Sequence, residues 1–556
     1  MKKHLFLFVI ILLHFLPGNA QTPAPPAPKG KSIEILHADF TDQNQNEIPG
    51  ALILTGNIEA QQDSMYIYCN KAYFFPNDNY LKLFGNVHII QNDTLQLNSN
   101  YAEYNGKEGI AFASGNVLMT SPDSSLKSEK VYYDKVNGVA YYNDHATIVN
   151  KLNTLKSKAG KYYTAEQKYE FRTQVIITNP DTEIKSEHLD YYEIPGHAYL
   201  FGPSTIKNKE NFIYTENGFY DTRLDIGKLI KNSHIISDNK RIEGDDMFYD
   251  KNKSYSRAIH NVKVTDTVNN MIMTSHFAEL FKDRDSIYVT DKPLVRMLTE
   301  NDTTYFHAKR IIVTGPDKER VLTGYHNARL FRTPDMSGKA DSLHYDQKIG
   351  LAQLIGNPVL FRGESQMTGK LIHLINNPVT EKLDSLKVLT DAFLIEKDSL
   401  GAGYNQAKGI NLYGKFRDNK LYEVDLVQNA EMIYYVYDED DELTGIDKSI
   451  CSRIHLELED NQITSATRFV NPEGELYPPA EYPESARLFP GFNWRGDEKI
   501  MRREDIFPPE ENDIGEKAEI DSEKQQKEAE KPMEASDATK NFIRKTKPAN
   551  VIKNGK

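Results

Sequence analysis

A repeated segment of about thirty residues constrains this chain more than any other feature of its sequence. Three copies are plain, at residues 52–58 (LILTGNI), 81–87 (LKLFGNV) and 111–117 (AFASGNV), and their glycines are 29 and then 30 positions apart. Weaker copies continue near His145, Gly202, Asn261, Asn327, Gly356, Asp391 and Asn429. This pattern indicates about twelve units, which predicts one stacked array in which each unit contacts mainly its neighbours.

Apolar residues alternate within each copy. Leu81, Leu83, Val87 and Ile89 share one parity, whereas His88 lies on the other face. Alternation with a period of two is typical of a strand with one buried face, because a helix would need apolar residues three and four positions apart. A second extended segment follows each copy, so we expect each unit to hold two strands joined by polar turns.

The glycine in the middle of each strand requires a physical reason, because Gly weakens a strand unless the backbone bends there. We expect each long strand to bend at this glycine and to pass from one sheet into a second sheet. Ser99 and Ser128 mark the matching bend in the returning strands. A β-bulge that only twists the strand is the alternative, although the regular position of the glycine favours the bend. Stacked bent hairpins predict an elongated all-β fold of two sheets in a V, with apolar faces turned inward.

The N-terminus has the features of an export signal. Residues 1–20 combine Lys2 and Lys3 with an apolar run and small residues at the end, which predicts a signal peptide. An uncleaved anchor is the alternative, but the apolar run is shorter than the roughly 20 residues that a membrane span needs. The Pro-rich residues 21–31 predict a stiff linker. We therefore expect an exported protein.

The rest of the chain divides by composition. We expect a β-repeat array over residues 32–400 and a C-terminal β-repeat region, ending in a Pro-rich segment, over residues 401–509. Residues 510–556 are dominated by Glu, Lys, Asp, Ser and Ala, so they bury too little apolar surface to offset their ordering entropy. We expect this segment to be a disordered, solubilising tail.

Charge and cysteine content exclude some classes of protein. The chain has 80 acidic residues against 67 Lys and Arg, a net charge of −13, which argues against a general nucleic-acid binder. An anionic lipid whose headgroup stays in water is not excluded. Cys69 and Cys451 lie at opposite ends of the array, so we expect two isolated small core residues and no disulfide.

Motifs for catalysis and metal binding are missing from the sequence. There is no Cys-x-x-Cys or His-x-x-x-His pair, no Gly-x-Ser-x-Gly and no phosphate-binding loop, so we expect no enzyme and no cofactor. The acidic run 438–442 can bind Ca²⁺ loosely, but it lacks the alternating ligand spacing of a calcium loop and is better interpreted as a solvated loop. Spacing alone does not exclude paired carboxylates of a glycoside hydrolase.

The repeat resembles a known family. The Gly-Asn-Val element, the Asp-Thr-Leu-x-Leu-x-Ser segment at residues 93–99 and the Tyr-rich return at residues 101–104 resemble the OstA/LptA-like (organic-solvent-tolerance-like) family. The resemblance is sharp over residues 50–150 and looser over residues 150–400. Four later stretches resemble long family members of the Bacteroidota type: Gly414–Leu421, Asn429–Tyr435, Asn471–Gly474 and Gly491–Arg495.

This resemblance implies a β-taco or β-jellyroll that shields the lipid A acyl chains of lipopolysaccharide, or a related glycolipid, in transit across the periplasm. It implies no catalytic residues. The implied partners are other β-jellyroll export components and an outer-membrane barrel translocon. Because there is no room for such a barrel after residue 509, the chain is better interpreted as a bridge or a barrel accessory.

Exposed strand edges are the expected contacts with these partners, because their unpaired backbone groups invite another strand. We expect residues 33–36 to pair with an upstream protein of the same fold and residues 454–458 to face the outer membrane. The alternative is that the linker and the tail cover these edges.

An open V with an apolar interior can shelter acyl chains. Because similar sites repeat along the array, a lipid that leaves one unit meets an equivalent surface at the next unit. The directional drive would come from an energised machine elsewhere. The candidate lining residues are Leu81, Leu83, Val87, Ile89, Leu95, Leu97, Ala102, Tyr104, Ala113, Val117, Met119, Leu126 and Tyr133. Inward alternation equally predicts that these residues close on each other as a dry core.

Two rival functions remain open. A structural or adhesive envelope β-solenoid that binds polysaccharide would display aromatic residues outward, as Tyr132, Tyr141 and Tyr192 can do. A polysaccharide lyase or hydrolase on a β-helix is the other alternative, although a glycine at a bend favours two sheets over a three-sided coil.

Overall fold

The structure is a computed structural model, which describes residues 32–511 apart from residues 45, 93, 300–301, 419 and 460–461. The predicted signal peptide, the predicted linker and residues 512–556 of the predicted tail lie outside the described residues. The chain divides into two units, Met1–Ala140 and Tyr141–Lys556. The predicted domain boundaries stay predictions.

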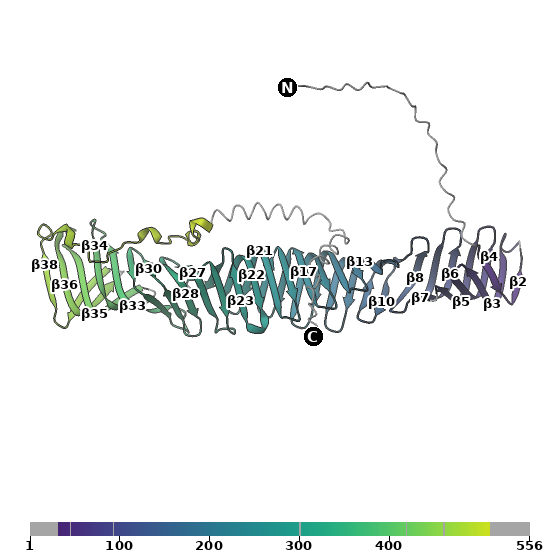
Figure 1. Cartoon of the computed structure of the whole chain (residues 1–556), viewed down its shortest axis with the longest axis horizontal. Coiled ribbons are helices and arrows are strands. Elements are labelled where there is room, and N and C mark those ends of the chain that lie inside the picture. Colours follow the sequence, from purple (N-terminus) through teal and green to yellow (C-terminus); the bar gives the residue numbers. More distant parts are fainter. Residues whose placement is uncertain are drawn as a thin grey trace, which may run out of the picture. The chain divides into compact units, whose positions relative to one another are not determined.

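Strands stack in sequence order in the first unit (Figure 1). They are β1 (Glu34–His37), β2 (Phe40–Asp42), β3 (Leu52–Gln62), β4 (Met65–Phe75), β5 (Tyr80–Gln91), β6 (Leu95–Asn105), β7 (Ile110–Thr120) and β8 (Ser124–Asp134), and β9 (Val139–Tyr142) begins at the end of the unit. Each strand from β3 to β8 pairs antiparallel with the next, so the unit is a ladder of hairpins.

The second unit continues the scheme with some strands divided into two halves; β16, for example, pairs with both β17 and β18. Its first strands are β10 (Ala146–Asn150), β11 (Thr154–Ser157), β12 (Ala159–Tyr163), β13 (Lys168–Thr178), β14 (Glu183–Tyr192), β15 (His197–Lys207), β16 (Asn211–Asp221), β17 (Ile226–Lys231), β18 (Ser233–Ser237), β19 (Lys240–Gly244), β20 (Asp246–Asp250), β21 (Tyr255–Asp266) and β22 (Met271–Phe281). Then follow β23 (Ser286–Thr290), β24 (Leu294–Leu298), β25 (Thr303–His307), β26 (Arg310–Thr314), β27 (Val321–Arg332), β28 (Met336–Asp346), β29 (Leu351–Ile355), β30 (Val359–Arg362), β31 (Ser365–Thr368) and β32 (Leu371–Asn376). The last are β33 (Leu383–Lys397), β34 (Tyr404–Arg417), β35 (Lys420–Tyr437), β36 (Leu443–Glu459), β37 (Gln462–Phe469) and β38 (Glu473–Tyr477).

Helical structure in the described residues comprises residues 509–511 and four short 3-10 helices: η1 (Lys282–Arg284), η2 (Glu484–Ala486), η3 (Gly496–Glu498) and η4 (Arg503–Ile506). The predicted all-β fold of stacked bent hairpins is therefore confirmed.

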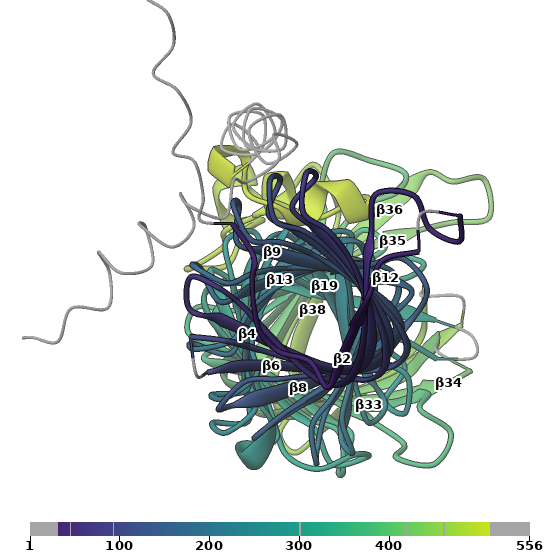
Figure 2. The ribbon, with the colours of Figure 1, turned by 90° about the vertical axis from the view of Figure 1, so that its right-hand side faces the viewer.

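Left-handed corners bend the long strands β3, β5 and β7. Gly85 and Asn86 have φ of +70° and +48°, and Phe84 pairs with Tyr101 while Val87 pairs with Ser99. Gly85 and Asn86 of β5 thus lie opposite the single residue Asn100 of β6. This arrangement is a β-bulge with glycine in the left-handed region. The strand bends at this bulge. The bend predicted at the glycine and the β-bulge given as its alternative are therefore the same feature. In Figure 2, which looks along the stack from the first unit, the strands of that unit bend into two arms.

We name the strand half before a left-handed corner arm A and the half after it arm B. The predicted corner serines lie on the returning strands, where Ser99 donates a hydrogen bond to the Tyr101 carbonyl at 3.0 Å and Ser128 to the Lys130 carbonyl at 3.1 Å. Cys69 makes the same contact with the Lys71 carbonyl at 3.4 Å. The same bond recurs in the second unit at Ser157, Ser186, Thr215, Ser275 and Cys451. Both cysteines are buried and free.

The structure contains corners that the sequence did not reveal. They lie at Thr173–Gln174, Asn232, Asp291–Lys292 and Val470–Asn471, all with positive φ. None of them contains glycine. Residues with a side chain adopt the left-handed conformation here because the surrounding strand ladder holds the backbone in it. The first three of these corners fall between predicted copies, so the repeat continues there at about thirty-residue spacing, whereas Val470–Asn471 follows the corner at Asn429 by 42 positions.

The last strands end differently from the prediction. Residues 454–458 lie inside β36, which pairs with β35 on one side and with β37 and β38 on the other. This stretch is consequently not an edge, and the outermost strands at this end are β37 and β38. Leu476 of β38 is 59% exposed, as expected of an unpaired edge.

Residues 478–511 form a segment that we call the strap, which turns back over the second unit (Figure 1). Along the strap, Phe489 contacts Gln406, Arg495 contacts Gln366 and Ile500 contacts Ser337, each through a backbone N–H. The strap thus runs antiparallel to the stacking order of the strands. It covers the outer face of arm B with two apolar clusters, which contain Phe393, Ile395, Ile433, Tyr435, Ile446, Tyr482 and Phe489, and Leu294, Phe331, Ile500 and Ile506.

Candidate functional site

The predicted lining residues of the first unit face its interior from both arms. Ladder pairs join Leu83 to Ala102 and Ala102 to Ala113 on arm A, and Ile89 to Leu97 on arm B. Eleven of the thirteen candidates are buried: Leu81, Leu83, Val87, Ile89, Leu97, Ala102, Tyr104, Ala113, Val117, Met119 and Leu126. The other two, Leu95 and Tyr133, lie near strand ends and are half-buried.

The interior of the second unit contains a cavity of about 450 Å³. Its apolar wall is formed from both arms by Met297, Phe306, Leu330, Tyr345, Ala352 and Leu374. A volume of several hundred Å³ is within the range of small-molecule pockets. The sequence prediction missed these residues because it relied on the Gly-Asn copies. The alternation of Ala328, Leu330 and Arg332 after the corner at residue 327 was the available signal.

Polar side chains surround the opening of this cavity, at the side of the array where the free ends of the two arms meet. We call this side the mouth. The polar residues that line the cavity include Asp317, Lys318, Glu319, Arg332, Lys348 and Asn376. The cavity is therefore amphipathic, with an apolar floor and a charged rim.

Hydrogen bonds between uncharged side chains join the two arms across the mouth at several positions along the array. In the first unit, the Tyr104 hydroxyl of arm A donates to Gln62 of arm B. In the second unit, Asn153 donates to the Tyr191 hydroxyl at 2.7 Å and Asn211 to the Tyr249 hydroxyl at 2.9 Å. Burial raises the pKa of the Tyr191 and Tyr249 phenols, so both groups stay neutral.

Ionic contacts replace these neutral bonds beside the cavity. Arg320, in the arm A turn before β27, contacts Asp266 at the arm B end of β21 at 3.3 Å, and both side chains are 1% exposed. At the other end of the cavity, Arg332 of arm B contacts Asp302 at 3.0 Å and donates to Asn376 of arm A at 2.8 Å. Burial raises the pKa of Tyr345 to about 12, so this cavity wall carries no phenolate.

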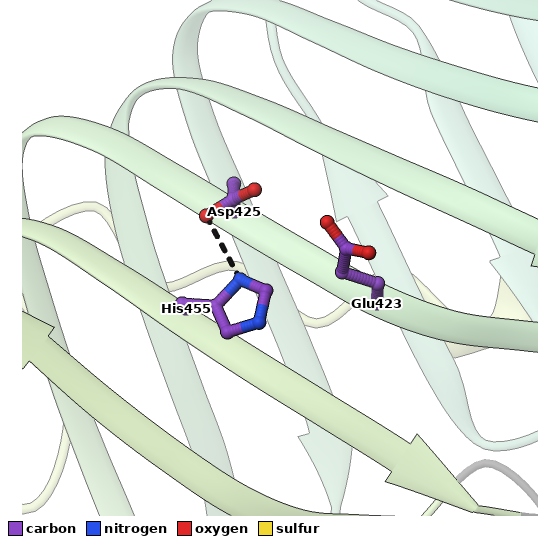
Figure 3. A group of neighbouring side chains, drawn as sticks. All are labelled: Glu423, Asp425 and His455. Carbon is purple, nitrogen blue, oxygen red and sulfur yellow. Dashed lines mark hydrogen bonds and ion pairs between the residues drawn. The ribbon is translucent and has the colours of Figure 1, made fainter.

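Glu423, Asp425 and His455 are close enough to hold a metal ion on neighbouring strands β35 and β36 (Figure 3). The His455 ring contacts Asp425 at 3.1 Å. Cationic side chains already neutralise both carboxylates, because Arg453 contacts Asp425 at 2.6 Å and Lys415 contacts Glu423 at 2.8 Å. These contacts favour an ion-pair network over a metal centre.

The acidic run 438–442 forms a local turn in which the Asp438 carboxylate accepts hydrogen bonds from the backbone N–H groups of Asp440 and Glu442. The carboxylate is thereby committed to its own loop, as in an Asx turn. The geometry agrees with the solvated loop that the sequence favoured.

Aromatic side chains form a row on the outer face of the first unit. Ring centroids lie 5.0 Å apart from Tyr73 to Phe84, 5.1 Å from Phe84 to Tyr101, and 4.9 Å from Phe112 to Tyr132. Tyr192 of the second unit packs in the same way on Tyr199, at 5.6 Å. Cross-strand aromatic pairs of this kind stabilise a sheet. Because each ring packs against its neighbours in the row, the row is better suited to stabilising the sheet than to stacking on sugar rings.

Stacked bent hairpins with an apolar interior and a polar mouth define an all-β class of repeat protein. Residues 30–187 match the family described as OstA-like protein, which confirms the resemblance and identifies an OstA-like region in this chain. The sequence matches none of the curated proteins with which it was compared.

A solved structure is also similar: LptH from Pseudomonas aeruginosa, described as the LptA-homologous periplasmic component of the conserved lipopolysaccharide transport device. The identity is 19%, over 25% of this chain and 82% of LptH, with a TM-score of 0.13. Within the part of the chain that the structure describes, no helix has the length and apolar character needed to cross a membrane.

Proposed function

We propose that this protein is a periplasmic OstA-like protein that shields the acyl chains of lipopolysaccharide, or a related glycolipid, during transport to the outer membrane. The observation that carries the proposal is the amphipathic cavity of about 450 Å³ in the second unit. Its apolar wall suits acyl chains, and its charged rim suits a headgroup that remains in water. The OstA-like match over residues 30–187 supports the same function.

Burial of acyl chains supplies the free energy of binding in this proposal. Each buried methylene contributes roughly 0.8 kcal/mol, so a single tight site would trap a lipid. Repeated apolar positions, such as Leu83, Ala102 and Ala113 on arm A, offer similar contacts at successive strands. A chain that leaves one strand pair therefore meets an equivalent surface at the next, and an external energy source sets the direction.

Strand edges are the proposed contacts with other export components. Ile35 of β1 pairs with Ala60 of β3, which leaves the opposite side of the short β1 strand as an edge of the described structure. Leu36 and Phe40 are 47% and 74% exposed nearby. Because exposed strands recruit further strands, we propose that a β-jellyroll partner pairs at β1 and that β38 takes the corresponding role at the other end.

Photo-crosslinking tests the acyl-shielding proposal. A benzoylphenylalanine at Val87, which is 1% exposed in the interior, is expected to capture lipopolysaccharide in cells. The matched control is the next residue, His88, which lies on the outer face of the same strand and should give no lipid adduct. Adducts that are absent at Val87, or equal at the two positions, would contradict the proposal.

A polysaccharide-binding envelope protein is the second candidate function, and the outer aromatic row is the observation that bears on it. Depletion of the protein separates the two functions. Loss of surface lipopolysaccharide is the expected outcome for transport, whereas loss of adhesion with normal surface lipopolysaccharide would favour polysaccharide binding.

A further inference from the structure

Arg320 is a buried cation at the mouth of the second unit. Its guanidinium contacts Asp317 at 2.7 Å, Asp266 at 3.3 Å and Asp285 at 3.8 Å. Asp317 and Asp285 belong to turns of arm A, whereas Asp266 ends an arm B strand. The ion pair between Arg320 and Asp266, which we call the clasp, therefore ties the two arms together.

The clasp contacts residues that line two cavities. Asp317 and Asn269 line the cavity of about 450 Å³, together with Leu330. Asp285 lines a second cavity of about 60 Å³, together with Leu280. The Arg320 guanidinium thus contacts one carboxylate from the lining of each cavity.

The bonding of the clasp allows it to open without stranding a buried charge. When the arms separate, Arg320 keeps its contact with Asp317, because both residues belong to the same turn. Asp266 keeps hydrogen bonds from the Asn239 amide at 2.9 Å and from the Asn269 amide at 2.8 Å, both on arm B. A buried ion pair normally resists separation because an unpaired charge is left behind. Here each charge retains a polar partner on its own arm.

We propose that the clasp is a gate between two compartments of the interior, and that an acyl chain resting in the larger compartment passes Arg320 only when the two arms separate. This inference rests on the proposed function. It assigns a transit role to Arg320 and Asp266, with an amphiphile bearing a long acyl chain as the ligand.

Crosslinking on either side of Arg320 tests the gate. Benzoylphenylalanine is placed at Leu330 in the larger compartment or at Leu280 in the smaller one, and the purified full chain is incubated with lipopolysaccharide of short sugar chain. We expect the adduct at Leu280 to be about tenfold weaker than at Leu330, a coupling within the usual range for two-state elements. The double substitution Asp266→Asn and Arg320→Met removes both charges and is expected to bring the two adducts to similar levels.

The matched control is Asp78→Asn with Lys107→Met, which removes an exposed ion pair between turns of the first unit (3.7 Å), outside both cavities, and should leave the adduct ratio unchanged. Equal adducts in the protein with an intact clasp would overturn the gate, and this measurement does not depend on how the clasp variant folds. An unchanged ratio in a clasp variant that melts like its parent would also overturn it. Absence of adducts at both positions and at Val87 would instead overturn the proposed function, and the gate with it.

Discussion

Left-handed backbone geometry at one or two residues determines where strands such as β5 and β7 bend. Gly115 has φ of +79°, and a Cβ added there would lie 2.9 Å from the Asn100 Cβ on the preceding strand. Glycine is required at this position for two reasons, the positive φ and the close approach of a neighbouring side chain. Gly50 has a similar φ of +81° but nothing within 4 Å of its added Cβ.

This pair of glycines gives a matched prediction. Gly50→Ala should cost about 1 kcal/mol, the strain of a left-handed alanine, whereas Gly115→Ala should cost at least about 2 kcal/mol because Asn100 must also move. Hydrogen exchange of the β6 and β7 amides measures the loss of stability around Gly115, and exchange of the β3 amides serves for Gly50. Equal losses would show that the Asn100 contact is unimportant.

Glu396 makes the stability of the second unit depend on pH. Burial raises the pKa of its carboxyl, the nearby Asp398 carboxylate raises it further, and the Asn405 amide opposes the shift. The folded state therefore binds the proton more tightly than the unfolded state does. The protonated Glu396 carboxyl therefore contributes its full stabilisation below the ordinary pKa of 4.5. This stabilisation is lost as the pH rises through the pKa that Glu396 has in the folded state.

Replacement by a neutral isostere should remove this dependence. Glu396→Gln is expected to raise the melting temperature at neutral pH. The melting temperature of this variant should also change less with pH above about 4.5 than that of the parent protein. Thermal melts of the two proteins across pH 4 to 8, a range of about four units, measure the difference. A variant that melts lower at neutral pH would show that the ionised carboxylate stabilises the fold through the Asn405 amide.

At the scale of elements, the strap stabilises strands that lie far away in the sequence. Leu294 and Phe331 are 6% and 5% exposed because Ile500 and Ile506 cover them. The strap packs on the outer face of strands whose inner face, at Phe306 and Leu330, lines the larger cavity. It therefore braces arm B beside this cavity.

Truncation tests this bracing. Removal of residues 478–556 should increase hydrogen exchange in β25 and β27 by at least about tenfold, because each large apolar side chain that becomes exposed costs roughly 1.5–3 kcal/mol. Removal of residues 512–556 alone leaves the strap in place and is the control, with no change expected in these strands. Equal exchange in the two truncated proteins would contradict a stabilising role of the strap.

At the scale of the whole molecule, the repeated pattern of the sequence corresponds to strands in both units. The apolar alternation at Leu81, Leu83, Val87 and Ile89 predicted strands with one buried face, and the Gly-Asn pairs predicted their bends. These features are local, because strand period and left-handed φ depend on a few neighbouring residues. Some corners without glycine, such as Thr173–Gln174, lack the Asn or Asp signal as well and were not predicted.

The candidate site was only partly predictable. The inward parity of the lining residues in the first unit follows from alternation, and eleven of the thirteen residues are buried. Alternation does not reveal where the arms stand far enough apart to leave a cavity. That separation depends on side-chain volumes contributed by several strands, as with Met297, Leu330 and Leu374.

The sequence by itself determined the class of fold, the length of the repeat and the position of most bends, because each follows from short-range backbone preferences. Only the tertiary structure decided which residues meet across the mouth. Arg320 and Asp266 are 54 positions apart, and no local pattern pairs them. Their contact, like the path of the strap, results from the stacking of successive hairpins, which brings distant turns together and buries their charges.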